Sequence, residues 1–172
     1  IVTCDGGFDF TEDYNSQENN SFKLLFCEIF ISLNIQSING NLIIKFFDIF
    51  NQNTCMLLYI LYCNYETINI FKPDMSRLSN SEKYIICENF LDKSSHFTNI
   101  MEQFYENPYG LNIDIPIEFI NTINEINIKH TNSQIIYINN ILNNIKLNIK
   151  YDSYDFKESI LWCKKYNIPI KN

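Results

Sequence analysis

The sequence predicts a mixed α/β fold, because short apolar segments of strand length alternate with longer segments in which apolar residues have helical spacing. Strand-like segments at 1–4, 41–47 and 67–71 are separated by two segments of the helical kind. Strands that alternate with helices are typical of a largely parallel sheet. A fourth strand-like segment, 83–87, follows the third with no helix between them, so we expect that last pair to be antiparallel.

The first strand and the first helix have clear ends. The apolar segment Ile1–Cys4 runs into Asp5-Gly6-Gly7, where glycine permits a tight turn or the close approach of a ligand. From 17 to about 36 the apolar residues recur at helical spacing, and Asn39-Gly40 ends that helix. We expect the next strand to follow directly.

The remaining elements divide the chain into two parts. A second helix is predicted from 53 to 64, with Asn53 as its N-cap. Residues 91–114 are interpreted as an irregular connection, and isoleucines at helical spacing then predict helices at 116–129, 131–147 and 152–166. We therefore expect a domain at 1–90, followed by a linker and a helical extension at 91–172.

The charge of the chain limits the ways in which it can bind nucleic acid. Its 172 residues carry a net charge of −7 at pH 7, which argues against non-specific binding, because affinity for phosphate depends on basic surface. Any RNA site must therefore be local. The basic candidates in the first part of the chain are Lys45, Lys72, Arg77 and Lys83.

Other residue types indicate an intracellular protein that needs neither metal nor membrane. None of the six cysteines forms a Cys-x-x-Cys pair, and we interpret them as reduced thiols. His96 and His130 have no partner at the spacing of metal ligands, so we expect no metal site. The longest uninterrupted apolar run, from Cys55 to Cys63, is too short to span a bilayer.

Three charged residues lie at strand ends that the predicted fold brings to one edge. Asp5 follows the first strand, Lys45 lies near the end of the second, and Glu82 opens the last. Ligands bind at the carboxyl ends of parallel strands, and Glu82 reaches that edge only if its strand is antiparallel. Each residue also has a simpler interpretation, as a turn aspartate or as a lysine or glutamate that extends to solvent at a strand edge.

The chain resembles the FtsJ-like family of RNA ribose 2′-O-methyltransferases, in particular the mRNA cap-methylating branch of eukaryotes and large DNA viruses. The resemblance runs from Ile1 to about Phe90. It rests on Asp5-Gly6-Gly7-Phe8, on Gln17-Glu18 before a long apolar helix, on Lys45-Phe46-Phe47-Asp48, and on the segment from Lys72-Pro73 through Ser76-Arg77 to Asn80-Ser81-Glu82-Lys83-Tyr84. Leu78 departs from the family, which usually has proline there.

The resemblance implies a site and a partial domain. The family has a catalytic set of lysine, aspartate, lysine and glutamate, and its last three members correspond to Asp5, Lys45 and Glu82. The resemblance further implies S-adenosylmethionine as methyl donor, with Asp5 and Gly6 binding it, and RNA binding by Lys72, Arg77 and Ser81. The first lysine and the glycine-rich donor loop have no counterpart in these residues. We therefore expect the C-terminal part of a Rossmann-like methyltransferase domain, which is inactive without the upstream half of the same domain.

The chemistry suits these residue types. A 2′-hydroxyl is a poor nucleophile that must lose its proton, and a lysine amine can accept the proton if burial lowers its pKa. Lys45 stands alone in an apolar run, where such a lysine is expected. The predicted substrate is capped mRNA, in the cytoplasm, a viral factory or the host nucleus. Ribosomal RNA as substrate, and an inactive domain that binds RNA or a partner, remain open alternatives.

Overall fold

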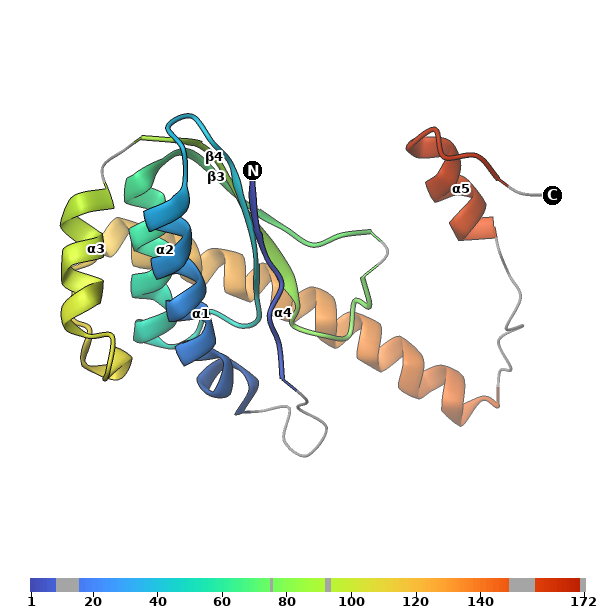
Figure 1. Ribbon diagram of the computed structural model, residues 1–172. Coiled ribbons are helices and arrows are strands. Elements are labelled where there is room, and N and C mark those ends of the chain that lie inside the picture. The colour runs from blue at the N-terminus through green and yellow to red at the C-terminus, as the bar shows by residue number, and fades with distance from the viewer. Residues whose placement is uncertain (9–15, 75, 92–93, 149–156, 171–172) are drawn as a thin grey trace. The chain divides into compact units, whose positions relative to one another are not determined.

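A computed structural model describes most of the chain (Figure 1). It consists of two compact units, Ile1–Ile136 and Tyr137–Asn172, which we treat separately. The residues whose structure is described are 1–8, 16–74, 76–91, 94–148 and 157–170.

A sheet forms the centre of the first unit. Among the described residues it has four strands, in the order β1-β2-β4-β3. They are β1 (Val2–Cys4), β2 (Leu42–Phe46), β3 (Tyr65–Phe71) and β4 (Lys83–Phe90). β1 pairs with β2 in parallel, and β4 pairs antiparallel with both β2 and β3. β1, β2 and β3 therefore run in the same direction and β4 runs against them, which confirms the prediction for the last strand.

Two helices cover one face of the sheet (Figure 1). α1 (Gln17–Ile35) connects β1 to β2, and α2 (Gln52–Asn64) connects β2 to β3. Because side chains alternate along a strand, every second residue of β2 points toward these helices and is buried. The face of α1 that the sequence predicts to be apolar is also buried: Phe22, Leu25, Phe26, Ile29 and Leu33.

The opposite face of the sheet is less covered. Ile43 and Lys45 of β2, and Tyr84 and Ile86 of β4, are only half-buried. The alternation thus separates a closed face, which forms the core, from a more open face that carries Lys45. A mixed α/β fold with this division confirms the predicted fold class.

The region after β4 differs from the prediction at two places. α3 (Ser94–Gln103) lies where we expected an irregular connection. Phe97, Ile100 and Met101 do have helical spacing, and they pack against the core. α4 (Ile117–Lys146) is continuous, although two helices were predicted with a break before Thr131. No proline or glycine occurs within it, so nothing in the sequence interrupts the backbone hydrogen bonds.

Three smaller observations complete the fold. A 3₁₀ helix, η2 (Pro108–Gly110), follows α3, and α5 (Lys157–Lys165) lies within the predicted last helix, whose first residues fall outside the described part. The N-cap of α2 is Asn51, two residues before the predicted one. None of the described helices is long and apolar enough to cross a membrane.

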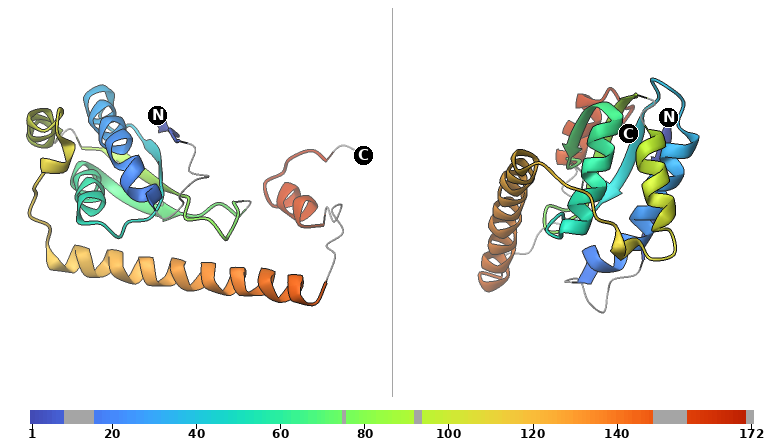
Figure 2. Two further views of the ribbon diagram at one scale, coloured as in Figure 1. Left: turned by 90° about the horizontal axis from the view of Figure 1, so that it is seen from below. Right: turned by 90° about the vertical axis from the view of Figure 1, so that its left-hand side faces the viewer.

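The first part of α4 belongs to the first unit and packs against the rest of that unit with few buried side chains. α2 lies between this part of α4 and α1 (Figure 2). Within α4 only Ile123 and Asn127 are buried among the described side chains. The Asn127 amide donates a hydrogen bond of 2.7 Å to the carbonyl of Ile49, just after β2. This bond therefore joins α4 to the segment that follows Lys45.

Replacing Asn127 by alanine should lower the free energy of unfolding by about 1–3 kcal/mol, because the buried carbonyl of Ile49 then loses its donor. Chemical denaturation measures the change. Asn124→Ala, at an exposed position of the same helix, is the matched control and should change stability by less than about 0.5 kcal/mol. Equal effects of the two substitutions would contradict the role given to Asn127.

Candidate active site

The strand register gathers the predicted site residues at one edge of the sheet. Lys45 of β2 lies directly opposite Tyr84 of β4. Glu82 precedes Tyr84 by two residues, so the pleat puts both on the face that carries Lys45. On the other side of β2, Cys4 pairs with Ile44 in parallel, which brings Asp5 beside Lys45.

Asp5 and Lys45 are in direct contact. The Lys45 ammonium lies 2.8 Å from Oδ1 of Asp5 and donates a second bond of 3.1 Å to the Asp5 carbonyl. The Lys45 side chain is 14% exposed, whereas the Asp5 side chain is 68% exposed. The amine is therefore held in place by a carboxylate that solvent, or a ligand, can still reach.

The two glycines after Asp5 let the backbone pass close to other groups of the site. The Gly6 amide donates to Oε1 of Glu28 at 2.9 Å, and a Cβ on Gly6 would lie 2.6 Å from the same oxygen. A Cβ on Gly7 would lie 3.3 Å from Nζ of Lys45. Burial raises the pKa of Glu28, against the effect of the Gly6 bond. Glu28 was not predicted, because nothing in a helical apolar pattern marks a glutamate that supports a loop.

Tyr84 links Glu82 to the rest of the site. Its hydroxyl donates to Oε1 of Glu82 at 3.4 Å. Burial, together with the nearby charges of Glu82 and Asp5, raises the pKa of Tyr84 to about 12. The sequence analysis did not include Tyr84 among the site residues, although its position two residues after Glu82 on one strand indicates a shared face.

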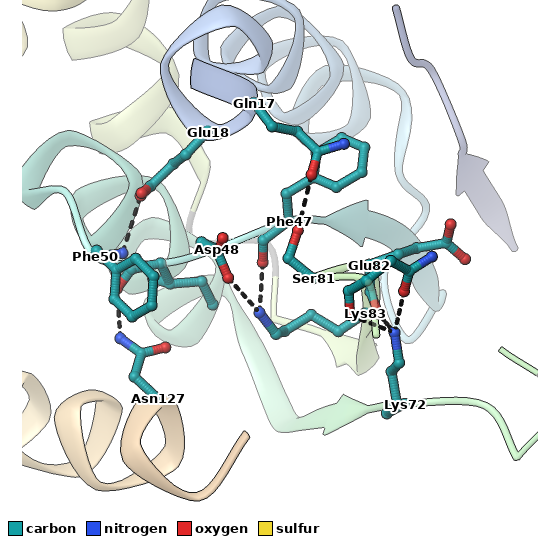
Figure 3. Close-up of polar contacts among 12 residues, drawn as sticks. Gln17, Glu18, Phe47, Asp48, Phe50, Lys72, Ser81, Glu82, Lys83 and Asn127 are labelled. Carbon is teal, nitrogen blue, oxygen red and sulfur yellow. Dashed lines mark hydrogen bonds and ion pairs between the residues drawn. The ribbon is translucent and has the colours of Figure 1, made fainter. Parts of the chain in front are cut away.

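Lys83 is part of the interior, and its interpretation as an RNA contact was wrong. It is 4% exposed, and its ammonium donates to the carbonyl of Phe47 at 2.6 Å. Oδ1 of Asp48 lies 3.6 Å from the same nitrogen. Burial lowers the pKa of Lys83, and Asp48 opposes that shift. Glu82 and Lys83 are consecutive and point in opposite directions (Figure 3), so only Glu82 faces the site.

The segment after β2 is held from several sides (Figure 3). Besides Lys83, the carboxylate of Glu18 on α1 accepts bonds from the backbone amides of Phe50 and Asn51, at 3.0 and 2.9 Å. Asn127 of α4 binds Ile49 from the opposite side. Since this segment directly continues the strand of Lys45, these contacts limit how far the end of β2 can move.

Two of the three predicted RNA contacts instead stabilise the loop between β3 and β4. The Lys72 ammonium donates to the side chain and carbonyl of Asn80 and, at 2.6 Å, to the carbonyl of Glu82. The Ser81 hydroxyl donates to the side-chain oxygen of Gln17 at 2.8 Å. Arg77 is exposed. Of these candidates Arg77 is thus the cation that is presented to solvent.

Carboxylates dominate the edge where a cofactor would lie. Asp5 contacts the Lys45 amine, Glu28 contacts the turn beside it, and Glu82 is bound by Tyr84, which lies opposite Lys45. Within the described residues no three His, Cys, Asp or Glu side chains come close enough together to hold a metal ion. The arrangement offers an oriented amine beside an accessible carboxylate, which suits proton transfer and the binding of a cation.

Comparisons with known proteins identify the family to which residues 1–90 are similar. The model of the family described as FtsJ-like methyltransferase matches residues 1–90. The chain is similar to cap-specific mRNA (nucleoside-2′-O-)-methyltransferase 1 of Bos taurus, with 34% identity over 70% of this chain. It is also similar to cap-specific mRNA (nucleoside-2′-O-)-methyltransferase 2 of Drosophila melanogaster, with 36% identity over 60% of this chain. Each alignment covers 15% of the relative's own length.

Lys83→Met should lower the free energy of unfolding by about 2 kcal/mol or more, because it leaves the Phe47 carbonyl without a donor and Asp48 without its cation. Urea denaturation tests this. Lys23→Met replaces an exposed lysine of α1 and should have little effect. If both variants are as stable as the wild type, Lys83 does not hold the two strands together.

Glu82→Gln should lower the pKa of Tyr84 from about 12 toward that of a free tyrosine, because it removes a negative charge beside the hydroxyl. Ultraviolet titration isolates this tyrosine as the difference between each protein and its Tyr84→Phe variant. A raised pKa favours the neutral hydroxyl in the folded state, so the associated stability is complete below about pH 10 and is lost as the pH rises toward 12.

The control for this titration is Glu88→Gln, which changes an exposed glutamate of the same strand. It should leave the pKa of Tyr84 unchanged. An identical Tyr84 titration in the Glu82 and Glu88 variants would show that the carboxylate of Glu82 does not act on the hydroxyl.

Proposed function

This chain belongs to the FtsJ-like methyltransferase family, and on that premise we propose that the protein methylates the ribose 2′-hydroxyl of RNA at the mRNA cap. The observation that carries the proposal is the contact between Asp5 and Lys45 at 2.8 Å, with Glu82 linked to the same edge through Tyr84. The similarity to cap-specific mRNA (nucleoside-2′-O-)-methyltransferases supports the cap as the position of methylation. Such a substrate is found in the nucleus and the cytoplasm.

We propose S-adenosylmethionine as the methyl donor, held by Asp5 and Gly6. The residues present fit it in charge, because the Asp5 carboxylate is exposed and suits a sulfonium cation. The turn after Asp5 is fixed by the 2.9 Å bond from the Gly6 amide to Glu28, so this carboxylate has a defined position. When bound, the donor supplies an electrophilic methyl group.

Lys45 is the proposed base. The 2′-hydroxyl has to give up its proton as its oxygen attacks, and Nζ of Lys45, in its amine form, would accept that proton. Asp5 holds this nitrogen through two contacts, so it positions the base for an in-line reaction. Glu82 is proposed to orient the reacting ribose, with Tyr84 fixing the direction of its carboxylate.

RNA is proposed to approach along the loop between β3 and β4. Arg77 would contact phosphate, while Lys72 and Ser81 contribute by shaping the loop through their bonds to Asn80, Glu82 and Gln17. The family resemblance also implies a first lysine and a glycine-rich donor loop. We propose that polypeptide beyond these 172 residues supplies both, so activity is tested in the full-length protein.

Lys45→Ala in the full-length protein should reduce methyl transfer by about 100-fold or more, because the reaction loses its base. Lys45→Arg should fail as well, since a guanidinium keeps the charge but cannot accept a proton at neutral pH. Transfer of a radiolabelled methyl group to capped and uncapped RNA measures both variants. Lys23→Ala, an exposed lysine of α1, is the control.

The same assay separates the alternatives. Label on capped RNA alone, lost in both Lys45 variants, supports the proposal. Label on both RNAs favours a broader or ribosomal substrate. No label on either RNA favours a domain that binds RNA or a partner without catalysis, and full activity of Lys45→Arg would remove Lys45 as the base.

A further inference from the structure

A cavity outside the candidate active site lies between α2, β3 and the first part of α4. It has a volume of about 620 Å³, which is within the range of small-molecule sites, roughly 300–1,000 Å³. Its floor is aliphatic and includes Ile68 and Ile70 of β3 and Ile123 of α4. β3 is the edge strand of the sheet among the described residues, so the cavity opens at the side of the molecule.

One end of the cavity is aromatic. Tyr59 and Tyr62 of α2 and Phe119 of α4 form a cluster with ring centroids 5.1 to 6.2 Å apart. Tyr62 is 57% exposed, so its ring remains accessible to a ligand. Asn69, Glu118 and Thr122 add polar groups to the lining.

The other end is basic. Lys129 and His130 of α4 line it, and His130 also lines a smaller cavity together with Lys72 and Lys83. Burial lowers the pKa of His130, and the charges of Lys83, Lys129 and Lys72 lower it further. Lys129 and Lys72 therefore bring positive charge near this end, whereas His130 is uncharged at neutral pH and offers a ring N–H, and the buried Lys83 is paired with Asp48.

We propose that this cavity binds one nucleotide of the RNA substrate, with its base against the aromatic end and its phosphate at Lys129 and His130. The inference rests on the proposed function, because it assigns a second contact for the same RNA. Bases stack on aromatic side chains without regard to sequence, and phosphates need local cations in an acidic protein. Asn69 and Glu118 offer hydrogen-bond partners to the edge of the base.

The position of His130 indicates how the RNA reaches the cavity. His130 lines both this cavity and the small cavity that is formed in part by Asn80 and Ser81. These two residues belong to the loop that ends at Glu82. A strand that leaves the proposed active site along this loop therefore meets the basic end first. An entirely apolar ligand would fill the aromatic end but leave the Lys129 ammonium at the other end without a counter-charge.

The test is the binding of a capped RNA of about ten nucleotides to the full-length protein, measured by fluorescence anisotropy. Tyr62→Ala should weaken binding about 5-fold or more, and Tyr62→Phe should restore it, because phenylalanine also stacks. Lys129→Ala should reduce the dependence of log affinity on log salt by about 0.7, the value for one phosphate of a single strand. Tyr105→Ala and Lys23→Ala, exposed residues of other elements, are the controls.

Short substrates make the test more specific. A capped dinucleotide, which ends near Lys45, should be methylated equally well by wild type and Tyr62→Ala, whereas the longer RNA should show a higher KM with unchanged kcat. Equal affinity of wild type and Tyr62→Ala for the longer RNA overturns the inference while leaving the methyltransferase proposal intact. Loss of affinity in Tyr62→Ala without methyl transfer by the wild type supports the cavity and overturns the proposed function.

Discussion

The buried ammonium of Lys83 is the interaction on which the rest of the site depends. It joins β4 to the segment after β2, through the Phe47 carbonyl at 2.6 Å and Asp48 at 3.6 Å. A buried cation without such partners is strongly unfavourable, so β4 is held at the register that provides them. That register pairs Phe46 with Lys83 and therefore sets Lys45 opposite Tyr84. A shift of one residue would turn Lys83 out of the core and Tyr84 into it.

Side chains alternate along β4, so the residue that stabilises the fold and the residues of the candidate active site lie on opposite faces of the sheet. Lys83 points into the core, and its neighbours Glu82 and Tyr84 point to the face of Lys45. The proposed nucleic-acid substrate requires local positive charge in an acidic chain, and Lys129 of α4 supplies it at the cavity, near Lys72. Charge that is sparse along the sequence thus becomes locally concentrated, which is the condition that phosphate binding requires.

α3 and α4 differ from the prediction for physical reasons. The isoleucine spacing predicts separate helices at 116–129 and 131–147, yet α4 continues through Thr131 without a proline or glycine to stop it. The segment 91–114 was predicted to be irregular, and the helical spacing within it rests on only three apolar residues, Phe97, Ile100 and Met101. Both cases show that short or interrupted patterns leave the type of an element undecided until it packs against a core.

The sequence by itself determined the α/β alternation, the reversed direction of the last strand, and the candidacy of Asp5, Lys45 and Glu82, because each of these depends on local spacing and on the ends of strands. The contact between Asp5 and Lys45 follows from two adjacent parallel strands, which the alternation also implies. Only the tertiary structure decided that Lys83 is buried, that Lys72 stabilises its own loop, and that α4 encloses a cavity with α2. These features arise from packing between segments that are far apart in the chain. The spacing of residues within a single segment does not predict such packing.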